Sequence, residues 1–138
     1  MRKLFFIIYV LIHRILAIKS LFLKIDMKIV EDKISIAELK LLAEEYFGDF
    51  VKAVVDVERE IAAFGGELHS DEEAMLLQNG SVQADLWGIN VYPGEHRNKW
   101  IEFDSMINIR PRQNNRSRNV EDEFIQKKIV EIINKLVN

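Results

Sequence analysis

The stretch FVKAVVDVEREIAAF, from Phe50 to Phe64, decides the fold of this chain. Its apolar residues recur with the period of a helix, but those from Val51 to Val57 also alternate with polar residues, as they do in a strand. The first half is rich in β-branched valine, and the charged residues Glu58 to Glu60 lie in the middle. We therefore predict a hairpin with strands from Val51 to Val57 and from Ile61 to Glu67, and keep a helix as the alternative.

The segment before this hairpin predicts a strand and a helix. Lys28 to Glu31 is a short strand candidate, and Ser35 followed by Glu38 has the spacing of a capping box at a helix start. Apolar residues then recur at helical spacing as far as Phe47, and Gly48 is placed to end the helix.

The segment after the hairpin predicts two strands between two helices. Ser70 followed by Glu73 repeats the capping-box spacing and opens a short helix. The other elements are a strand from Leu86 to Tyr92, a longer strand from Trp100 to Ile109 and an amphipathic helix from Val120 to Val137. This order predicts an α+β fold of ferredoxin-like βαββαβ type plus a C-terminal strand and helix, with a mainly antiparallel sheet and helices on one face.

The composition is that of one small globular domain. The chain has 138 residues, of which 49% are hydrophobic and 30% charged, and it has no cysteine for disulfides or thiolate metal sites. We expect a single α+β domain from residue 27 to 138 and a cytoplasmic location.

Residues 1–26 form a hydrophobic extension. The uninterrupted apolar run ends at Ile12, and His13 and Arg14 follow near the middle of the apolar window from residue 4 to 23. A central arginine costs about 3 kcal/mol in a bilayer, which brings insertion close to break-even. Three interpretations stay open: Met27 is the true start, residues 4–23 are a marginal membrane anchor, or the segment is a folded helical extension.

Without this extension the domain is acidic. Of the 19 basic and 22 acidic side chains, 14 basic and 21 acidic ones follow residue 26, so the net charge of the domain is about −7. Bulk binding of nucleic acid is therefore disfavoured, and any such site has to be a local basic patch.

Three separated segments carry a resemblance to a known family. They are GGELHSD from Gly65 to Asp71, DLWGINVYP from Asp85 to Pro93 and WIEFDSMINIRP from Trp100 to Pro111. With these segments in this order, the chain from Met27 to Val137 resembles the uncharacterised prokaryotic family catalogued as domain of unknown function 5674. The resemblance implies a start near Met27, and it implies no activity, cofactor or catalytic residue.

The first candidate site follows the hairpin. Glu67, His69 and Asp71 alternate, so on an extended chain they project to one side, with Glu73 close by. An imidazole beside carboxylates suits a divalent metal or proton transfer. The competing interpretation is a helix start, where acidic residues are favourable electrostatically.

The second candidate is the segment RPRQNNRSR, from residue 110 to 118. Four arginines occur there without an acidic residue, in an otherwise acidic domain. Arginine forks suit phosphate or carboxylate groups, whereas the competing interpretation is a loop paired with surplus acids. The predicted ligand-binding residues here are Arg110, Arg112, Asn115, Arg116 and Arg118.

The third candidate is a polar set within the two strands. Trp87, Asn90 and Asn108 are predicted to line a ligand pocket, with Asp104 as a candidate catalytic residue. Ser105 lacks the Gly-x-Ser-x-Gly context of a serine hydrolase.

The leading hypothesis is a small binding module for an anionic, phosphate-bearing ligand or a nucleic-acid end. One alternative is a metal-dependent or acid-base hydrolase or nuclease that uses His69, Asp71 and Asp104. Another is a structural partner protein that forms homo-oligomers through exposed sheet edges. Whether His69 lies beside the segment 110–118 separates the first two, and the sequence names no cofactor or metal.

Overall fold

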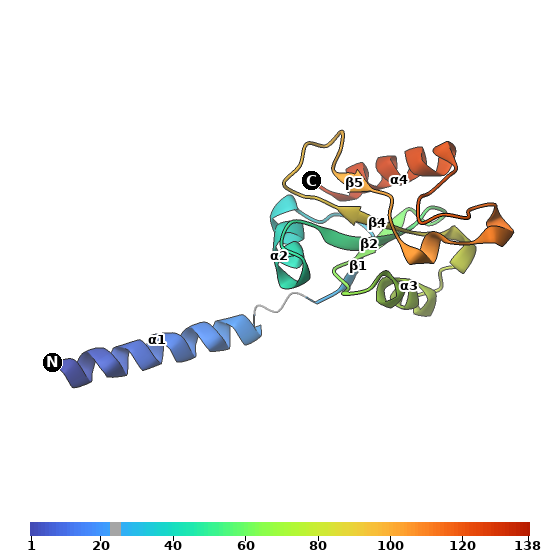
Figure 1. Cartoon of the computed structure of the whole chain (residues 1–138). Coiled ribbons are helices and arrows are strands. Elements are labelled where there is room, and N and C mark those ends of the chain that lie inside the picture. Colours follow the sequence, from blue (N-terminus) through green and yellow to red (C-terminus); the bar gives the residue numbers. More distant parts are fainter. Residues whose placement is uncertain (23–25) are drawn as a thin grey trace.

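The protein is an α+β domain built on one antiparallel sheet. The computed structural model describes residues 1–22 and 26–138, and in these it contains four α-helices and five strands (Figure 1). The strands are β1 (Lys28–Val30), β2 (Val51–Asp56), β3 (Ile61–Phe64), β4 (Leu86–Val91) and β5 (Ile101–Glu102). The helices are α1 (Arg2–Phe22), α2 (Ile36–Tyr46), α3 (His69–Gln78) and α4 (Glu123–Leu136), and the short 3-10 turns are η1 (Gln83–Asp85), η2 (Met106–Asn108) and η3 (Pro111–Gln113).

The predicted hairpin is confirmed, and the helical alternative for residues 50–64 is wrong. β2 and β3 pair antiparallel from Ala53↔Phe64 to Asp56↔Ile61. The buried carboxylate of Asp56 holds the turn, because Oδ1 accepts hydrogen bonds from the backbone N–H groups of Glu58 and Arg59. Its Oδ2 accepts a hydrogen bond from the hydroxyl of Ser81 at 2.6 Å.

The strand order differs from a ferredoxin-like sheet. The strands lie in the order β1-β3-β2-β4-β5, so β4 pairs with β2, on the far side of the hairpin from β1. In a ferredoxin-like sheet the last strand would pair with β1 instead. β2 and β4 each have six residues and pair along their whole length, from Val51↔Val91 to Asp56↔Leu86, whereas β1 offers three. The longer ladder satisfies more backbone groups, which explains the order.

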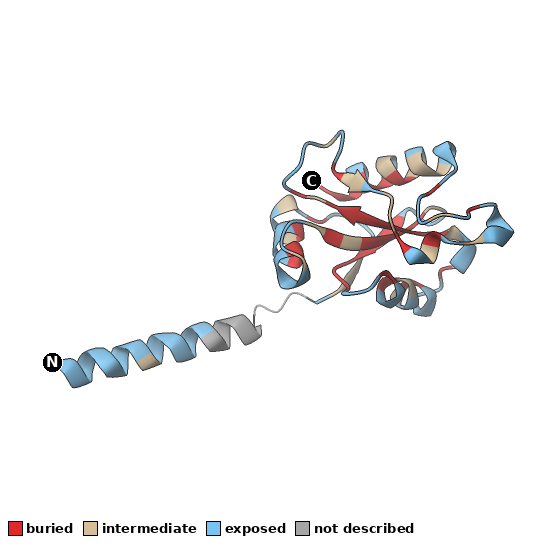
Figure 2. Ribbon diagram, in the orientation of Figure 1, coloured by how far each residue is buried: buried red, intermediate tan, exposed pale blue. Residues whose placement is uncertain are grey.

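Helices cover both faces of the sheet, so the prediction of helices on one face is wrong. On one face α2 and α4 pack on Ala53, Phe64 and Ile89, and on the other α3 packs through Leu76 on Val54 and Ala63. Strands β2 and β4 are consequently buried along nearly their whole length (Figure 2). Strands buried on both faces lose the alternation of apolar and polar residues, which is why the sequence pattern was ambiguous.

Several element boundaries also differ from the prediction. The predicted strand from Trp100 to Ile109 is wrong beyond Glu102, because the chain leaves the sheet and turns into η2, where the Ser105 hydroxyl accepts a hydrogen bond from the N–H of Ile107. Helix α3 begins at His69 without a side-chain cap, so Ser70 is not its N-cap. The Ser35 cap of α2 is confirmed, and α4 begins after Asp122, whose carboxylate caps it.

The extension before residue 27 contains helix α1. Its apolar side chains from Leu4 to Leu16 are largely exposed, and Figure 1 shows the helix projecting from the domain. Among the described residues, the helices are too short or too polar to cross a bilayer. The end of the window from 4 to 23, together with Lys24, lies outside the described residues. The interpretation of Met27 as the true start stays a prediction.

Candidate functional site

The arginine-rich segment is organised by Asn108, which imitates a strand. Its Oδ1 accepts the backbone N–H of Gly88 at 2.8 Å, and its Nδ2 donates to the backbone oxygen of Gly88 at 2.9 Å. β4 thus finds a hydrogen-bonding partner beyond the end of β5, supplied by a side-chain amide. The same Nδ2 also donates to the backbone oxygen of Arg118 at 2.9 Å, which anchors the far end of the segment.

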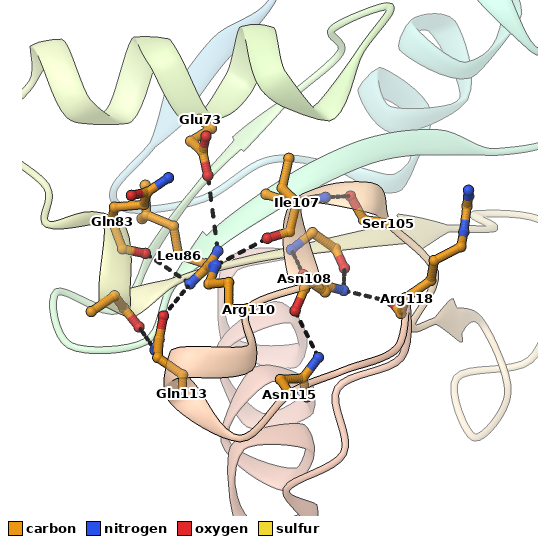
Figure 3. A network of polar contacts seen from close by, with 12 residues as sticks. Glu73, Gln83, Leu86, Ser105, Ile107, Asn108, Arg110, Gln113, Asn115 and Arg118 are labelled. Atoms are coloured by element: carbon orange, nitrogen blue, oxygen red, sulfur yellow. Dashed lines mark hydrogen bonds and ion pairs between the residues drawn. The ribbon is translucent and has the colours of Figure 1, made fainter.

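Arg110 clamps the near end of the segment. Its guanidinium donates to the backbone oxygens of Ile107, Gln83 and Leu86 (Figure 3). It also lies 4.8 Å from the centroid of the Trp87 ring. Oε2 of Glu73, in α3, lies 3.8 Å from Nη2 of Arg110 and forms an ion pair with it. The fork of donors is directed at the protein's own carbonyls, so little of it faces a ligand.

Asn115 closes the loop between these two anchors. Its Nδ2 donates to the backbone oxygens of Asn108 and Asn119, both at 2.7 Å, and its Oδ1 accepts the N–H of Glu121. Three of the predicted ligand-binding residues, Asn108, Arg110 and Asn115, therefore hold the loop itself. Arg112 and Arg116 are exposed, and no ion pair within residues 1–22 and 26–138 involves them.

Arg118 differs from the other arginines. Its backbone oxygen belongs to the network around Asn108, but its side chain points away from that network (Figure 3). The guanidinium pairs with Asp104, and this pair lowers the pKa of the Asp104 carboxyl and raises that of Arg118. Both charges lie close enough to act on the pKa of His69. The C-terminal end of the segment therefore lies near enough to His69 for the charge of Arg118 to affect its pKa.

His69 is held in its neutral form. It lies at the start of α3 and is 7% exposed, and its Nε2 is 2.8 Å from the backbone oxygen of Ile89. Burial lowers its pKa to about 4, with the charge of Lys52 adding to this effect and that of Asp104 opposing it. Because a carbonyl can only accept a hydrogen bond, Nε2 carries the proton and Nδ1 is left as an acceptor.

A row of polar side chains across the sheet completes the surroundings. Lys52 of β2, Asn90 of β4 and Glu102 of β5 are neighbours in the strand register. Asn90 is 5% exposed and donates from Nδ2 to Glu102 at 2.8 Å, while its Oδ1 is buried without a partner among the described residues. We call this row, with His69, Asp104 and Arg118, the polar cluster.

A buried acid, Glu72, lies within range of the charge of Lys52 in the polar cluster. Glu72 of α3 is completely buried behind Gly66, whose N–H donates to Oε1 at 2.8 Å. Burial raises the pKa of Glu72 well above its ordinary value, against the opposing effects of the Gly66 hydrogen bond and the charge of Lys52. Burial therefore disfavours the charged form of Glu72, and the charge of Lys52 favours it.

The structure thus brings together only part of the predicted sites. His69, Asp104, Asn90 and Arg118 converge, whereas Asp71 is exposed and lines a separate surface cleft of about 520 Å³ with Asp26 and Glu67. Trp87 belongs to the hydrophobic core. Within the part of the chain that the structure describes, no three His, Asp or Glu side chains are placed to hold a metal ion. The hydrolase and nuclease hypothesis stays a prediction.

The sequence reasoning missed Lys52, Glu72 and Glu102. A lysine inside an apolar strand was a visible signal for the first of these. The other two were unremarkable in sequence, because a helix start attracts acidic residues and an edge strand tolerates them.

The described residues define a small three-layer α+β protein with a polar cluster at one end of its sheet. A family model, protein of unknown function DUF5674, matches residues 28–136. The chain belongs to this family, as its sequence resemblance indicated. None of the curated proteins and none of the solved structures compared with it matches.

Proposed function

We propose that this protein is a small binding module for a ligand that carries one acidic group, a phosphate or a carboxylate, together with hydrogen-bond donors. The polar cluster, which includes Arg118, holds this ligand, and Arg112 and Arg116 of the loop do not. The observation that carries the proposal is the buried Oδ1 of Asn90, which has no partner among the described residues, on a strand position paired with Lys52 and next to the carbonyl that holds His69.

The two cations supply the acid-binding half of the site. Lys52 is half-buried, and none of the ion pairs among the described residues includes it; its Nζ lies 5.1 Å from the centre of the Phe47 ring. Arg118 uses Nε for Asp104, which leaves its terminal amino groups to face a second anion. A guanidinium fork and an ammonium are the usual side-chain partners of phosphate and carboxylate.

The buried acceptors supply the other half. Oδ1 of Asn90 has no partner within the part of the chain that the structure describes, and Nδ1 of His69 is an acceptor. Buried acceptors are costly unless a donor reaches them, so the ligand should bring hydroxyl or amine groups. Asp104 offsets part of the charge of Arg118, and this partial compensation favours a single acidic group over a polyphosphate.

The test is ligand binding by isothermal titration with a small panel. The probes are inorganic phosphate, a hexose phosphate, a nucleoside monophosphate, an α-amino acid and a nucleoside triphosphate. For a probe that binds, Lys52→Gln and Arg118→Gln should each weaken affinity about 10- to 100-fold, the value of one charge-assisted hydrogen bond. Arg112→Gln and Arg116→Gln are the matched controls and should bind normally.

Three outcomes would refute the proposal. Weaker binding in the Arg112 and Arg116 variants, with unchanged binding in the Lys52 variant, would show that the ligand binds to the arginine loop and not to the polar cluster. If none of the mono-acidic probes binds, or if the Lys52 and Arg118 variants bind every probe as the parent does, the polar cluster is not a ligand site.

A further inference from the structure

Helix α1 presents two distinct faces along its first four turns. Arg2 and Lys3 are separated by 11 residues from His13 and Arg14. Eleven residues make about three helical turns, so these four side chains lie on one face. Phe6 and Val10 share this side of the helix, but the first acidic residue of the sequence is Asp26, so every charge on this side is positive.

The opposite face is apolar and uncovered. Leu4, Ile8, Leu11 and Ile15 follow the i, i+4, i+7, i+11 spacing of one helix face. They are 62%, 44%, 52% and 52% exposed. Flanking apolar residues widen this stripe, and Phe5, Ile12 and Leu16 are exposed as well.

We propose that α1 is an in-plane membrane anchor, which lies in the surface of a bilayer containing anionic phospholipids. The apolar stripe enters the acyl region while the basic face stays at the level of the headgroups. A helix lying in the plane keeps Arg14 in the headgroup layer, whereas a helix crossing the bilayer would carry Arg14 into hydrocarbon.

Charge selects this partner over a second copy of the chain. Two α1 helices packed through their stripes would turn both basic faces outward, and α1 has no acidic residue to pair with these charges. An anionic bilayer offers negative charge along the whole length of the helix. The acidic domain after residue 26 is repelled by the same surface, so it stands off the membrane with its polar cluster in water.

The absence of cysteine permits a test that separates the two faces. The full-length variants Ile8→Cys and His13→Cys each carry one thiol, on the apolar and the basic face respectively, and are labelled with an environment-sensitive nitrobenzoxadiazole dye. With vesicles of phosphatidylcholine and phosphatidylglycerol in a 70:30 ratio, the emission at position 8 should shift to the blue, and that at position 13 should shift much less. Pure phosphatidylcholine vesicles should give a weak response at both positions.

Vesicle flotation measures the electrostatic part of the same anchor. The full-length triple variant Arg2→Gln, Lys3→Gln, Arg14→Gln should lose roughly two orders of magnitude in partition onto the anionic vesicles, because each cation near the surface contributes roughly five-fold. The double variant Arg112→Gln, Arg116→Gln removes exposed charge from the domain and should float like the parent.

Other results would overturn the proposal. Equal blue shifts at positions 8 and 13 would indicate a helix buried on all sides, as in a bilayer-crossing segment. A blue shift at position 8 before vesicles are added, with a dimer in light scattering, would assign the stripe to a second copy. The absence of any shift with anionic vesicles would exclude the membrane as the partner.

Discussion

Substitution of Gly88 by alanine places one methyl group between β4 and the loop that begins at Ser105. A Cβ on Gly88 would lie 2.5 Å from Oγ and 2.6 Å from Cβ of Ser105, and 3.1 Å from Cγ1 of Ile107. Ser105 is 1% exposed and Gly88 itself is buried, so neither residue has room to move away. The backbone of Gly88 also carries two hydrogen bonds with the Asn108 amide.

The expected loss is about 3 kcal/mol in the free energy of unfolding. Overpacking of a closed core costs about 1–3 kcal/mol, and weakening the two hydrogen bonds adds about 1 kcal/mol. For a domain of this size 1 kcal/mol corresponds to about 3–4 °C, so the melting temperature should fall by about 10 °C. Urea denaturation followed by the fluorescence of the buried Trp87 and Trp100 measures the change directly.

Two further variants make this prediction specific. Gly94→Ala is the matched control, because its added Cβ meets nothing within 4 Å, and its stability should be unchanged. Ser105→Gly removes both of the closest clashing atoms, so the double variant with Gly88→Ala should be more stable than the sum of the two single changes predicts. A loss below about 0.5 kcal/mol for Gly88→Ala, or simple additivity in the double variant, would refute the close packing of β4 against Ser105.

Arg110→Lys should lower the free energy of unfolding by about 2–4 kcal/mol, because one ammonium cannot replace a guanidinium that donates to three carbonyls. The control Arg112→Lys changes an exposed side chain, and its free energy of unfolding in the same urea titration should lie within about 0.5 kcal/mol of the parent. His69 has a pKa of about 4 in the folded protein, below its ordinary value of 6.5. Between these two pH values the unfolded chain binds more protons than the folded one. The stability that His69 contributes is therefore lost as the pH falls from 6.5 through 4. This loss amounts to about 3 kcal/mol at most and should be absent in His69→Gln, and equal pH dependence of unfolding in the two proteins would contradict it.

The sequence was sufficient to locate most of the elements. Ser35 caps α2, valine enrichment distinguishes the hairpin from a helix, and the apolar stripe of the last helix is observed in α4. These features depend on residues within one or two turns or on a neighbouring strand. Local spacing along the chain therefore carries the information, and the predicted elements agree with the structure except near their ends and in the segment from residue 103 to 109.

The predicted site residues were less informative as a set. Four arginines without an acid indicated an anion site, but Arg110 donates to backbone oxygens of Gln83 and Leu86, which lie more than twenty residues away in sequence. An arginine that binds a ligand and one that clamps a loop have the same local sequence. Only the partner distinguishes them, and the partner is supplied by the tertiary structure.

By itself, the sequence indicated that the chain after residue 26 is acidic and of α+β class, with a β2–β3 hairpin and a helix α2 capped by Ser35, because helix, strand and turn preferences act over a few residues. The tertiary structure decided that β4 lies beside β2, that α3 covers the face opposite α2 and α4, and that His69 is neutral near Lys52 and Arg118. Strand partners and pKa shifts arise from burial and from distances between groups remote in sequence, and the folded chain alone sets these distances.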